Sequence, residues 1–341
     1  MLNSVMRKLS ALALLAIGIV AGGVAAAAGP TVLTQPTNQP TCVYFPITIQ
    51  SSGSYILGSN LVLPPSCDKN GILINVDNVV LDLGGFSIIG RGGEANGIGI
   101  SASNRANIVV KNGSVLSMPG SGISLGANAM VADVTVTNSG HGDGIQIVNG
   151  TVRHVRSTGN KINGIETTSV SQGSEITNSV ASNNGNQGIL TVLATVSGNT
   201  VTENAAAGIF CDPHGASTIQ GNVASKNGAQ GIFCELSSIL NNVCQLNTLD
   251  GIRGSGQITN NTVSQNLARG IFADNPASIV GNVITENALF GILTSTIYSF
   301  GNNQISFNNG ETDMVKMTPQ TSGGVEISPN ICDGNTTCPG P

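Results

Sequence analysis

The 341-residue chain is poor in charge and in aromatic side chains: Lys, Arg, Asp and Glu make up 9%, Phe, Trp and Tyr 3%, and Trp is absent. The net charge of -5 argues against a nucleic-acid partner, because phosphate backbones are bound through clustered Lys and Arg. There is no P-loop, dinucleotide fingerprint, metal-site Cys/His spacing or Ser-nucleophile motif. The chain does contain 45 Gly and 40% apolar residues, which argues against disorder and suits uniform aliphatic layers joined by small turn residues.

The first 28 residues predict a cleaved secretory signal. Arg7 and Lys8 precede an apolar run, and an Ala-x-Ala sequence ends at Ala28. The apolar stretch reaches roughly 20 residues, so an uncleaved membrane anchor is the alternative. About 310 residues remain after cleavage, a length that a solenoid holds in one domain. We expect the mature protein to be exported to the periplasm, cell surface or exterior, with no later membrane span.

Seven Cys residues in an exported chain predict disulfides. Two pairings follow from proximity in the sequence: Cys42 with Cys67, and Cys332 with Cys338. Cys211 and Cys234 lie one repeat apart, where stacked strands are about 4.8 Å from each other. They form either a third disulfide or two buried thiols, and Cys244 is left over.

The strongest pattern is a repeat of about 21 residues. Seven times an Asn is followed, four residues later, by Gly-Ile, and successive Gly-Ile units lie 19 to 24 residues apart. These residues are Asn160, Asn184, Asn204, Asn227, Asn247, Asn266 and Asn287. Further Gly-Ile units begin at Gly71, Gly97, Gly122 and Gly144. Such repeats stack into a solenoid, here of about eleven turns.

Within each repeat, buried and variable positions alternate as in a strand with one buried face, for example in Gly231-Ile232-Phe233-Cys234-Glu235. Ile and the residue two positions later are predicted to point inward. The second inward position holds small residues: Thr167, Thr191, Cys211, Cys234, Gly254, Ala273 and Thr294. A second strand is predicted to end in Val, at Val180, Val201, Val223, Val243, Val263 and Val283.

The repeated Asn is predicted to be structural. Asn tolerates unusual backbone angles in turns, and stacked amides can form a hydrogen-bonded ladder along the axis. The Gly that follows is expected to admit a tight bend. The length variation falls between Gly-Ile and the next Asn, so insertions are expected on another side of the solenoid.

Two upstream segments, 78–86 and 107–113, alternate like strands before a glycine turn. With the Gly-Ile units, they resemble secreted right-handed parallel β-helix repeat proteins of the pectin-lyase-like superfamily over residues 71–308. The resemblance implies an all-β, single-stranded right-handed parallel β-helix, capped by residues 29–70 and 309–341. It leaves the activity open, because this fold carries enzymes, adhesins and inert spacers.

If each Ile points inward, the next residue forms an outward column. This column holds Glu166, Leu190, Phe210, Phe233, Arg253, Phe272 and Leu293, and two residues further come Asp212, Glu235, Ser255 and Asp274. Aromatic faces beside carboxylates and an Arg predict a carbohydrate-binding strip, because sugars present apolar faces and polar rims. Its contacts would be Phe210, Phe233, Phe272 and Asp274, and its partner a polysaccharide or cell-surface glycan. Alternatively, the C-terminal tail or another chain covers the stripe in a structural or adhesive protein of unknown oligomeric state.

The sequence Asp212-Pro213-His214 resembles the signature of mannuronan C5-epimerases, which are also parallel β-helices. That resemblance implies catalysis on a uronate, as epimerase or lyase, with His214 as general base beside Asp212. Glu235 and Arg253, on the next turns, are catalytic candidates by position. The tyrosine that this family places before the motif is absent here, and Gly215 follows the His where the family has an acid.

A second cluster is Gly140-His141-Gly142-Asp143, which contains the Gly-His-Gly string of polygalacturonases. The Asp pair and the Arg-Ile-Lys segment of those hydrolases are absent, so a glycine turn with a surface His is the alternative. Asp143 and Glu166 suggest a Ca²⁺ site, although two carboxylates fall short of the six or more oxygens that Ca²⁺ takes. No cofactor is assigned, and the metal question stays open.

Overall fold

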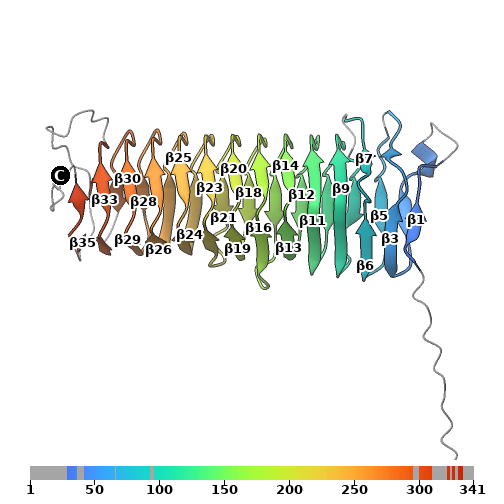
Figure 1. Cartoon of the computed structure of the whole chain (residues 1–341), viewed down its shortest axis with the longest axis horizontal. Helices are drawn as coiled ribbons and strands as arrows, with labels where there is room; N and C mark the ends of the chain where they lie inside the picture. Colours follow the sequence, from blue (N-terminus) through green and yellow to red (C-terminus); the bar gives the residue numbers. More distant parts are fainter. Residues whose placement is uncertain are drawn as a thin grey trace, which may run out of the picture.

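A computed structural model describes residues 29–36, 42–65, 67–92, 96–294, 299–308, 321–322, 325–326 and 329–332. The chain winds into an elongated parallel β-helix whose turns stack along the long axis (Figure 1). Among the described residues, η1 (Cys42–Tyr44) is the only helix, and no helix there is long and apolar enough to cross a membrane. The predicted signal, residues 1–28, lies outside the described part.

Three parallel sheets, named A, B and C in chain order, form the walls. Sheet A holds the strands that begin at the repeated Ile, and one further strand at the C-terminal end that begins at Thr321. They are β2 (Ile47–Ile49), β5 (Ile72–Ile74), β8 (Ile100–Ala102), β10 (Ile123–Leu125), β12 (Ile145–Ile147), β15 (Ile165–Thr167), β18 (Ile189–Thr191), β21 (Ile209–Cys211), the first parts of β24 (Ile232–Leu240) and β26 (Ile252–Thr259), β28 (Ile271–Ala273), β31 (Ile292–Thr294) and β34 (Thr321–Ser322).

Sheet B follows sheet A in each turn. Its strands are β1 (Thr31–Leu33), β3 (Gly53–Leu57), β6 (Val79–Asp82), the first parts of β9 (Ile108–Leu116) and β11 (Ala129–Thr137), β13 (Gly150–Arg153), β16 (Ser174–Thr177), β19 (Ala194–Ser197), β22 (Thr218–Gln220), the second parts of β24 and β26, β29 (Ala277–Val280), β32 (Ser299–Gly301) and β35 (Val325–Glu326).

Sheet C closes each turn. Its strands are β4 (Leu61–Val62), β7 (Ser87–Ile89), the second parts of β9 and β11, β14 (Arg156–Thr158), β17 (Val180–Ser182), β20 (Thr200–Thr202), β23 (Val223–Ser225), β25 (Val243–Gln245), β27 (Thr262–Ser264), β30 (Val283–Thr285), β33 (Gln304–Ser306) and β36 (Ile331–Cys332).

The predicted right-handed parallel β-helix is confirmed, but the predicted count of eleven turns is too low. The solenoid has about 13 turns, and the added turns contain β2 and β34, which lie in the segments predicted as caps. Neither β2 nor β34 begins at the Ile of a Gly-Ile dipeptide, so a count of these dipeptides did not include their two turns. In the third turn of sheet A, Ile100 rather than Ile98 is in register with Ile72 and Ile123.

One continuous core runs along the axis from Phe45 to Cys332. The predicted inward positions of sheet A are confirmed: each repeated Ile from Ile100 to Ile292 is fully buried, and small residues such as Thr191 and Cys211 lie beside them. The prediction that the sheet C strands end in Val is wrong: four of them begin at Val, and Val201 and Val263 are the middle residues of their strands. Val201 and Val263 are buried, whereas Val180, Val223, Val243 and Val283 point outward, because these repeats place Val one residue earlier in the strand. A shift of one residue moves a side chain to the other face.

The seven repeated Asn residues form the predicted ladder in the bend between sheets C and A. Each Nδ2 donates to Oδ1 of the next Asn at 2.8 to 3.0 Å, from Asn160 to Asn308. Each Oδ1 also accepts the backbone N–H of the preceding ladder Asn. The ladder therefore satisfies buried polar groups at every turn.

The unusual backbone angle predicted for the ladder Asn lies one residue earlier. The residues before the ladder have φ of 54° to 68°: Gly159, Asn183, Glu203, Lys226, Leu246, Gln265, Glu286 and Phe307. This left-handed residue bends the chain, and the following Asn then points inward. The Gly of Gly-Ile is needed for space, because a Cβ on Gly231 would lie 2.7 Å from Nδ2 of Asn247 and 2.6 Å from the Gly251 carbonyl oxygen.

A second ladder, absent from the sequence predictions, occupies the bend between sheets B and C. It runs through Asn199, Asn222, Asn242, Asn261, Asn282, Asn303 and Asn330, with Nδ2 to Oδ1 distances of 2.9 to 3.0 Å. The same two-residue arrangement recurs here: a left-handed Asn or Gly comes first, as at Gly198 and Asn241, and the ladder Asn follows.

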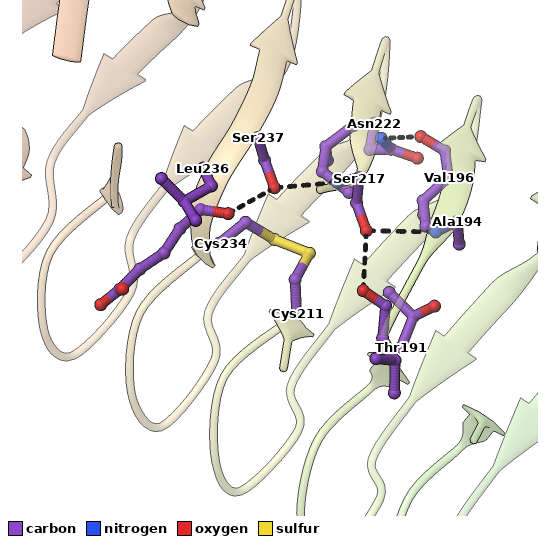
Figure 2. Close-up of a disulfide and its surroundings, with 12 residues drawn as sticks. Thr191, Ala194, Val196, Cys211, Ser217, Asn222, Cys234, Leu236 and Ser237 are labelled. Atoms are coloured by element: carbon purple, nitrogen blue, oxygen red, sulfur yellow. Dashed lines mark hydrogen bonds between the residues drawn. A yellow bond between two sulfur atoms is a disulfide. The ribbon is translucent and has the colours of Figure 1, made fainter. Parts of the chain in front are cut away.

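Two predicted disulfides are present, Cys42 with Cys67 and Cys211 with Cys234. The second joins successive rungs of sheet A inside the solenoid (Figure 2). Cys211 and Cys234 therefore form a disulfide and are not two buried thiols. Beside it, the Ser217 and Ser237 side chains accept the N–H groups of Ala194 and Ser217 (Figure 2). Cys244 is free and buried, and burial raises the pKa of its thiol. Cys332 is disulfide-bonded, whereas its predicted partner, Cys338, lies outside the described residues.

Replacing a ladder Asn in mid-solenoid should strongly destabilise the fold. Asn227 is fully buried, accepts from Nδ2 of Asn204 and donates to Oδ1 of Asn247, both at 3.0 Å. We expect Asn227→Leu to lower the free energy of unfolding by roughly 3 to 6 kcal/mol, because each buried group left unsatisfied costs about 1–3 kcal/mol. Urea denaturation followed by circular dichroism measures this loss. The control is Lys226→Asn at the adjacent left-handed position, which should be neutral or stabilising; equal losses in both variants would contradict a special role for the amide.

Candidate functional site

The outward face of sheet A carries the predicted aromatic column in register. Phe210 of β21 is opposite Phe233 of β24, Phe233 is opposite Arg253 of β26, and Arg253 is opposite Phe272 of β28. All four side chains are partly exposed. We call this column, with the neighbouring Asp212, Glu235 and Asp274, the aromatic strip.

The rings and the guanidinium groups contact one another along the strip. Phe210 and Phe233 meet edge to face, with ring centroids 5.1 Å apart. Arg253 lies between Phe233 and Phe272, its guanidinium carbon 4.7 Å and 5.4 Å from the two ring centroids. The guanidinium carbon of Arg269 lies 3.7 Å from the ring centroid of Phe272. Such cation–π contacts contribute about 0.5–1 kcal/mol each at exposed sites, so the strip is a preorganised surface.

The covalent link behind the strip strengthens this order. Cys211 and Cys234 each follow one of the two paired Phe residues and point to the opposite side of the sheet. Their disulfide holds the Cα atoms 4.6 Å apart. The two rungs that carry Phe210 and Phe233 are therefore bonded to each other directly beneath the rings.

Arg253 of the strip and Arg269 beside it are both ion-paired. Arg253 donates from Nη2 and Nε to Oδ2 of Asp274, at 2.5 and 3.2 Å. Arg269 makes a two-point contact with Asp250, from Nε to Oδ1 at 2.7 Å and from Nη2 to Oδ2 at 3.0 Å. The sequence predictions missed this second pair. Its signal was available, because Asp250 and Arg269 both occupy the position just before Gly-Ile, where side chains from successive turns meet.

Asp212 and His214 lie in the connection from sheet A to sheet B. The next two turns have no such connection, because β24 and β26 run without a break from one sheet to the other. The Asp212 carboxylate contacts Nδ1 of His214 and accepts the His214 backbone N–H at 3.1 Å. Hydrogen bonds from the His214 side chain and backbone lower the pKa of Asp212. The imidazole is 75% exposed, so this motif forms an open polar turn at the edge of the strip.

The four predicted catalytic residues do not form one constellation of contacts. Asp212 and His214 pair with each other, Arg253 pairs with Asp274, and Glu235 accepts a hydrogen bond from Nδ2 of Asn275 at 3.1 Å. Among the tyrosines, Tyr44 and Tyr55 belong to the first turns, and Tyr298 lies outside the described residues. The prediction that Ser255 points outward is wrong: it is fully buried, and its hydroxyl accepts the N–H of Leu236 at 2.7 Å.

Asp143 and Glu166 lie close to each other on earlier turns of the solenoid, nearer its N-terminal end. Oδ1 of Asp143 accepts the backbone N–H of Asn163 at 2.9 Å, and the Asn163 side chain donates to Glu166 at 3.1 Å. Burial of Asp143 and its hydrogen bond with Glu166 raise the pKa of Asp143 to about 7. Among the described residues, no group of three or more His, Cys, Asp or Glu side chains is placed to hold a metal ion.

A hollow of about 580 Å³ lies elsewhere, on sheet B. Its lining includes Met130, Thr151 and Glu175, and no aromatic side chain is among its residues. A broad, shallow surface without aromatic rings has little to hold a sugar ring in place. We therefore take the aromatic strip as the candidate site.

Comparison with known proteins supports the fold. The chain is similar to the mannuronan C-5 epimerase AlgE6 A-module of Azotobacter vinelandii, with 16% identity and a TM-score of 0.51, over 84% of this chain and 81% of that one. A double mutant of the periplasmic alginate epimerase AlgG has 14% identity and a TM-score of 0.54, over 89% of this chain and 78% of that one. The protein therefore shares the parallel β-helix fold of these two proteins. No curated protein matches its sequence.

The model of one protein family, described as periplasmic copper-binding protein (NosD), matches residues 192–335, which is less than half of the chain. The described residues of this segment do not fit a copper site. Cys211 and Cys234 are tied in a disulfide, Cys332 is disulfide-bonded, Cys244 is buried in the core, and His214 is the one imidazole. Thiolate or imidazole ligands would have to come together for such a site.

The buried Asp143 should make stability fall as pH rises. Its folded pKa of about 7 lies above the unfolded value of about 3.9. Between these two values the folded state holds a proton that the unfolded state has lost. The protonated Asp143 therefore contributes its full stabilisation below about pH 4, and this stabilisation is lost as the pH rises through about 7. We expect Asp143→Asn to flatten this slope in urea midpoints from about pH 5 to about pH 8. An Asn side chain still accepts from Asn163 and offers an N–H to Glu166.

Asp250→Asn is the matched control for this prediction. Its carboxylate is also buried, but it is bonded by Arg269, so an amide weakens the contact. This variant should lower the urea midpoint at every pH in the range. Parallel pH profiles for the native protein and Asp143→Asn would contradict the assignment.

Proposed function

We propose that the protein is an exported polysaccharide-binding platform that holds sugar rings along the aromatic strip. The observation that carries this proposal is the register of Phe210, Phe233, Arg253 and Phe272 on one sheet face, with carboxylates beside them. Rings supply apolar area for sugar C–H faces, and carboxylates accept hydrogen bonds from hydroxyl groups. A flat strip that follows the axis suits a polymer better than a small molecule, which is usually enclosed in a pocket.

Export is supported by the N-terminal sequence and by the disulfides. Residues 1–28 have the charged, apolar and small-residue regions of a secretory signal. Cys42–Cys67 and Cys211–Cys234 are bonded, as is typical of proteins in oxidising compartments. We infer a periplasmic, surface or extracellular location.

The described part of the C-terminal tail supports an accessible strip. Thr321 and Ser322 of β34 stack on Ile292 and Leu293 of β31 and so extend the solenoid at its end. Arg253, Phe272 and Leu293 separate them from Phe233 along the column. A structural or adhesive role, with a partner protein on the strip, is the competing proposal.

Catalysis on a uronate is the third candidate, and one feature favours it. Asp212 and His214 match the Asp-Pro-His motif in sequence and contact each other. Against it, Arg253 is bonded by Asp274 and is not free to neutralise a substrate carboxylate. Proton abstraction from a uronate needs such neutralisation, so binding is the better-supported function.

Replacing Phe233 should weaken glycan binding while the fold stays intact. We expect Phe233→Leu to raise the Kd for an immobilised glycan at least about fivefold, because a central aromatic side chain commonly contributes more than 1 kcal/mol to binding. The control is Val283→Ala, an outward-facing residue of sheet C that is 39% exposed, which should leave Kd unchanged. A glycan array followed by calorimetry gives the measurement, and urea midpoints confirm that both variants fold.

His214→Ala separates the platform from the enzyme. On the platform, binding survives this change and no product forms. Formation of unsaturated uronate, or altered C5 configuration in alginate, that disappears in His214→Ala would instead establish catalysis. Loss of a bound protein partner on Phe233→Leu, with no glycan bound, would favour the adhesive role.

A further inference from the structure

The charges around the aromatic strip do not balance. Residues 190–294 contain six acidic side chains and three basic ones, Lys226, Arg253 and Arg269. Each basic side chain is already paired with a carboxylate: Lys226 with Glu203 at 4.0 Å, Arg253 with Asp274, and Arg269 with Asp250. The cations of this half of the solenoid are therefore committed to partners within the chain.

Three carboxylates in the same segment have contacts of a different kind. Asp212 contacts His214, Glu235 accepts from the amide of Asn275, and Glu286 accepts from the amide of Gln265 at 2.7 Å. The amides bonded to Glu235 and Glu286 each satisfy one oxygen but leave the charge in place. The partner of Asp212 is the exposed imidazole of His214, so none of the three carboxylates is paired with Lys or Arg.

Two of these three carboxylates stand beside the paired rings. Asp212 comes two residues after Phe210, and Glu235 two residues after Phe233, so each lies next to its ring along the same rung. Cys211 and Cys234 are in register on adjacent rungs, which lie about 4.8 Å apart along the axis, and Asp212 and Glu235 follow them directly in the chain. Hydrogen bonds from His214 lower the pKa of Asp212 further, so its carboxyl group is ionised.

This arrangement favours a cation and disfavours an anion. Two carboxylates at neighbouring rungs repel a third, and the effect is strongest where apolar rings lower the local dielectric. A protonated amine, in contrast, can be bound by both carboxylates and by the ring faces, which attract cations.

Building on the proposed polysaccharide platform, we infer that the strip at Phe210 and Phe233 selects a glycan with free amino groups, a glucosamine-type polymer, over polyuronates. Asp212 and Glu235 hold the sugar ammonium group, and the rings hold the sugar face. The site thus differs in charge preference from one that acts on mannuronan, even though the fold is shared.

Three hexasaccharides of different charge test this inference: glucosamine, N-acetylglucosamine and mannuronate. Calorimetry at mildly acidic pH, where the sugar amines carry a proton, should rank them in that order, with the glucosamine hexamer bound at least tenfold more tightly than the mannuronate hexamer. Added salt should weaken the binding of the glucosamine hexamer, because screening reduces exposed charge interactions. A mannuronate hexamer bound as tightly as the other two, or more tightly, would overturn the inference.

Charge-neutral variants identify the residues responsible. The double variant Asp212→Asn, Glu235→Gln should weaken binding of the glucosamine hexamer at least tenfold and leave the N-acetylglucosamine hexamer unchanged. Glu286→Gln removes a carboxylate of the same kind away from the rings and should change neither. Equal effects of the double variant and Glu286→Gln would overturn the assignment.

The outcomes also separate this inference from the proposed function. Binding of all three hexamers that is lost in Phe233→Leu but does not depend on charge would keep the platform and refute the selectivity. Binding of none of the hexamers, at any ionic strength, would refute both.

Discussion

The hydrogen bond between inward Asn amides of successive turns is the interaction on which the other features of this solenoid depend. A primary amide has two donors and an acceptor that takes two hydrogen bonds, and a buried one is costly unless these are used. The Asn160 to Asn308 ladder uses them between turns, so a turn of the wrong length would leave amides unpaired on both sides. Between Asn160 and Asn308, length variation is therefore confined to the connections after sheet A, such as residues 212–217, while the bends that hold the ladders keep their geometry.

Constant register at the bends converts a repeat in the sequence into columns on the surface. Because Ile209, Ile232, Ile252 and Ile271 stack without slippage, the residues that follow them must be neighbours. Contacts on the strip consequently run between rungs: ring on ring, guanidinium on ring, and Arg253 to the carboxylate one turn later. A single substitution in the column therefore changes the surroundings of the side chains on both neighbouring turns. The binding specificity of the strip thus depends on the order of side chains along successive rungs.

Periodicity predicted the solenoid, the inward Ile, the ladder and the aromatic column, because these follow from the repeat interval and from the alternation within each repeat, whereas the right-handed β-helix was implied by the family resemblance. Features that depend on backbone conformation were not predicted. Before the first ladder the bending residue is Asn or Gly in only two of eight turns, and in the other six it is a residue such as Lys226 or Leu246, so its left-handed φ has no signature in the sequence there. Ser255 was misplaced because the unbroken strand β26 changes which residues face the core as it passes from sheet A to sheet B. The Arg269–Asp250 pair escaped notice because its residues precede the strand pattern rather than belonging to it.

The Asp-Pro-His sequence shows why a short motif has to be read with its neighbours. In isolation Asp212 and His214 form a turn, in which the carboxylate accepts from the imidazole and the backbone of a residue two positions later. Whether such a turn abstracts a proton depends on what adjacent rungs supply, namely a cation for the substrate carboxylate and a second acid or base. The adjacent rung supplies Glu235, which adds negative charge, and the cation on the next rung, Arg253, is held by Asp274. The Asp-Pro-His turn of this chain thus faces a carboxylate where proton abstraction from a uronate needs a positive charge, and for this reason we propose binding rather than catalysis.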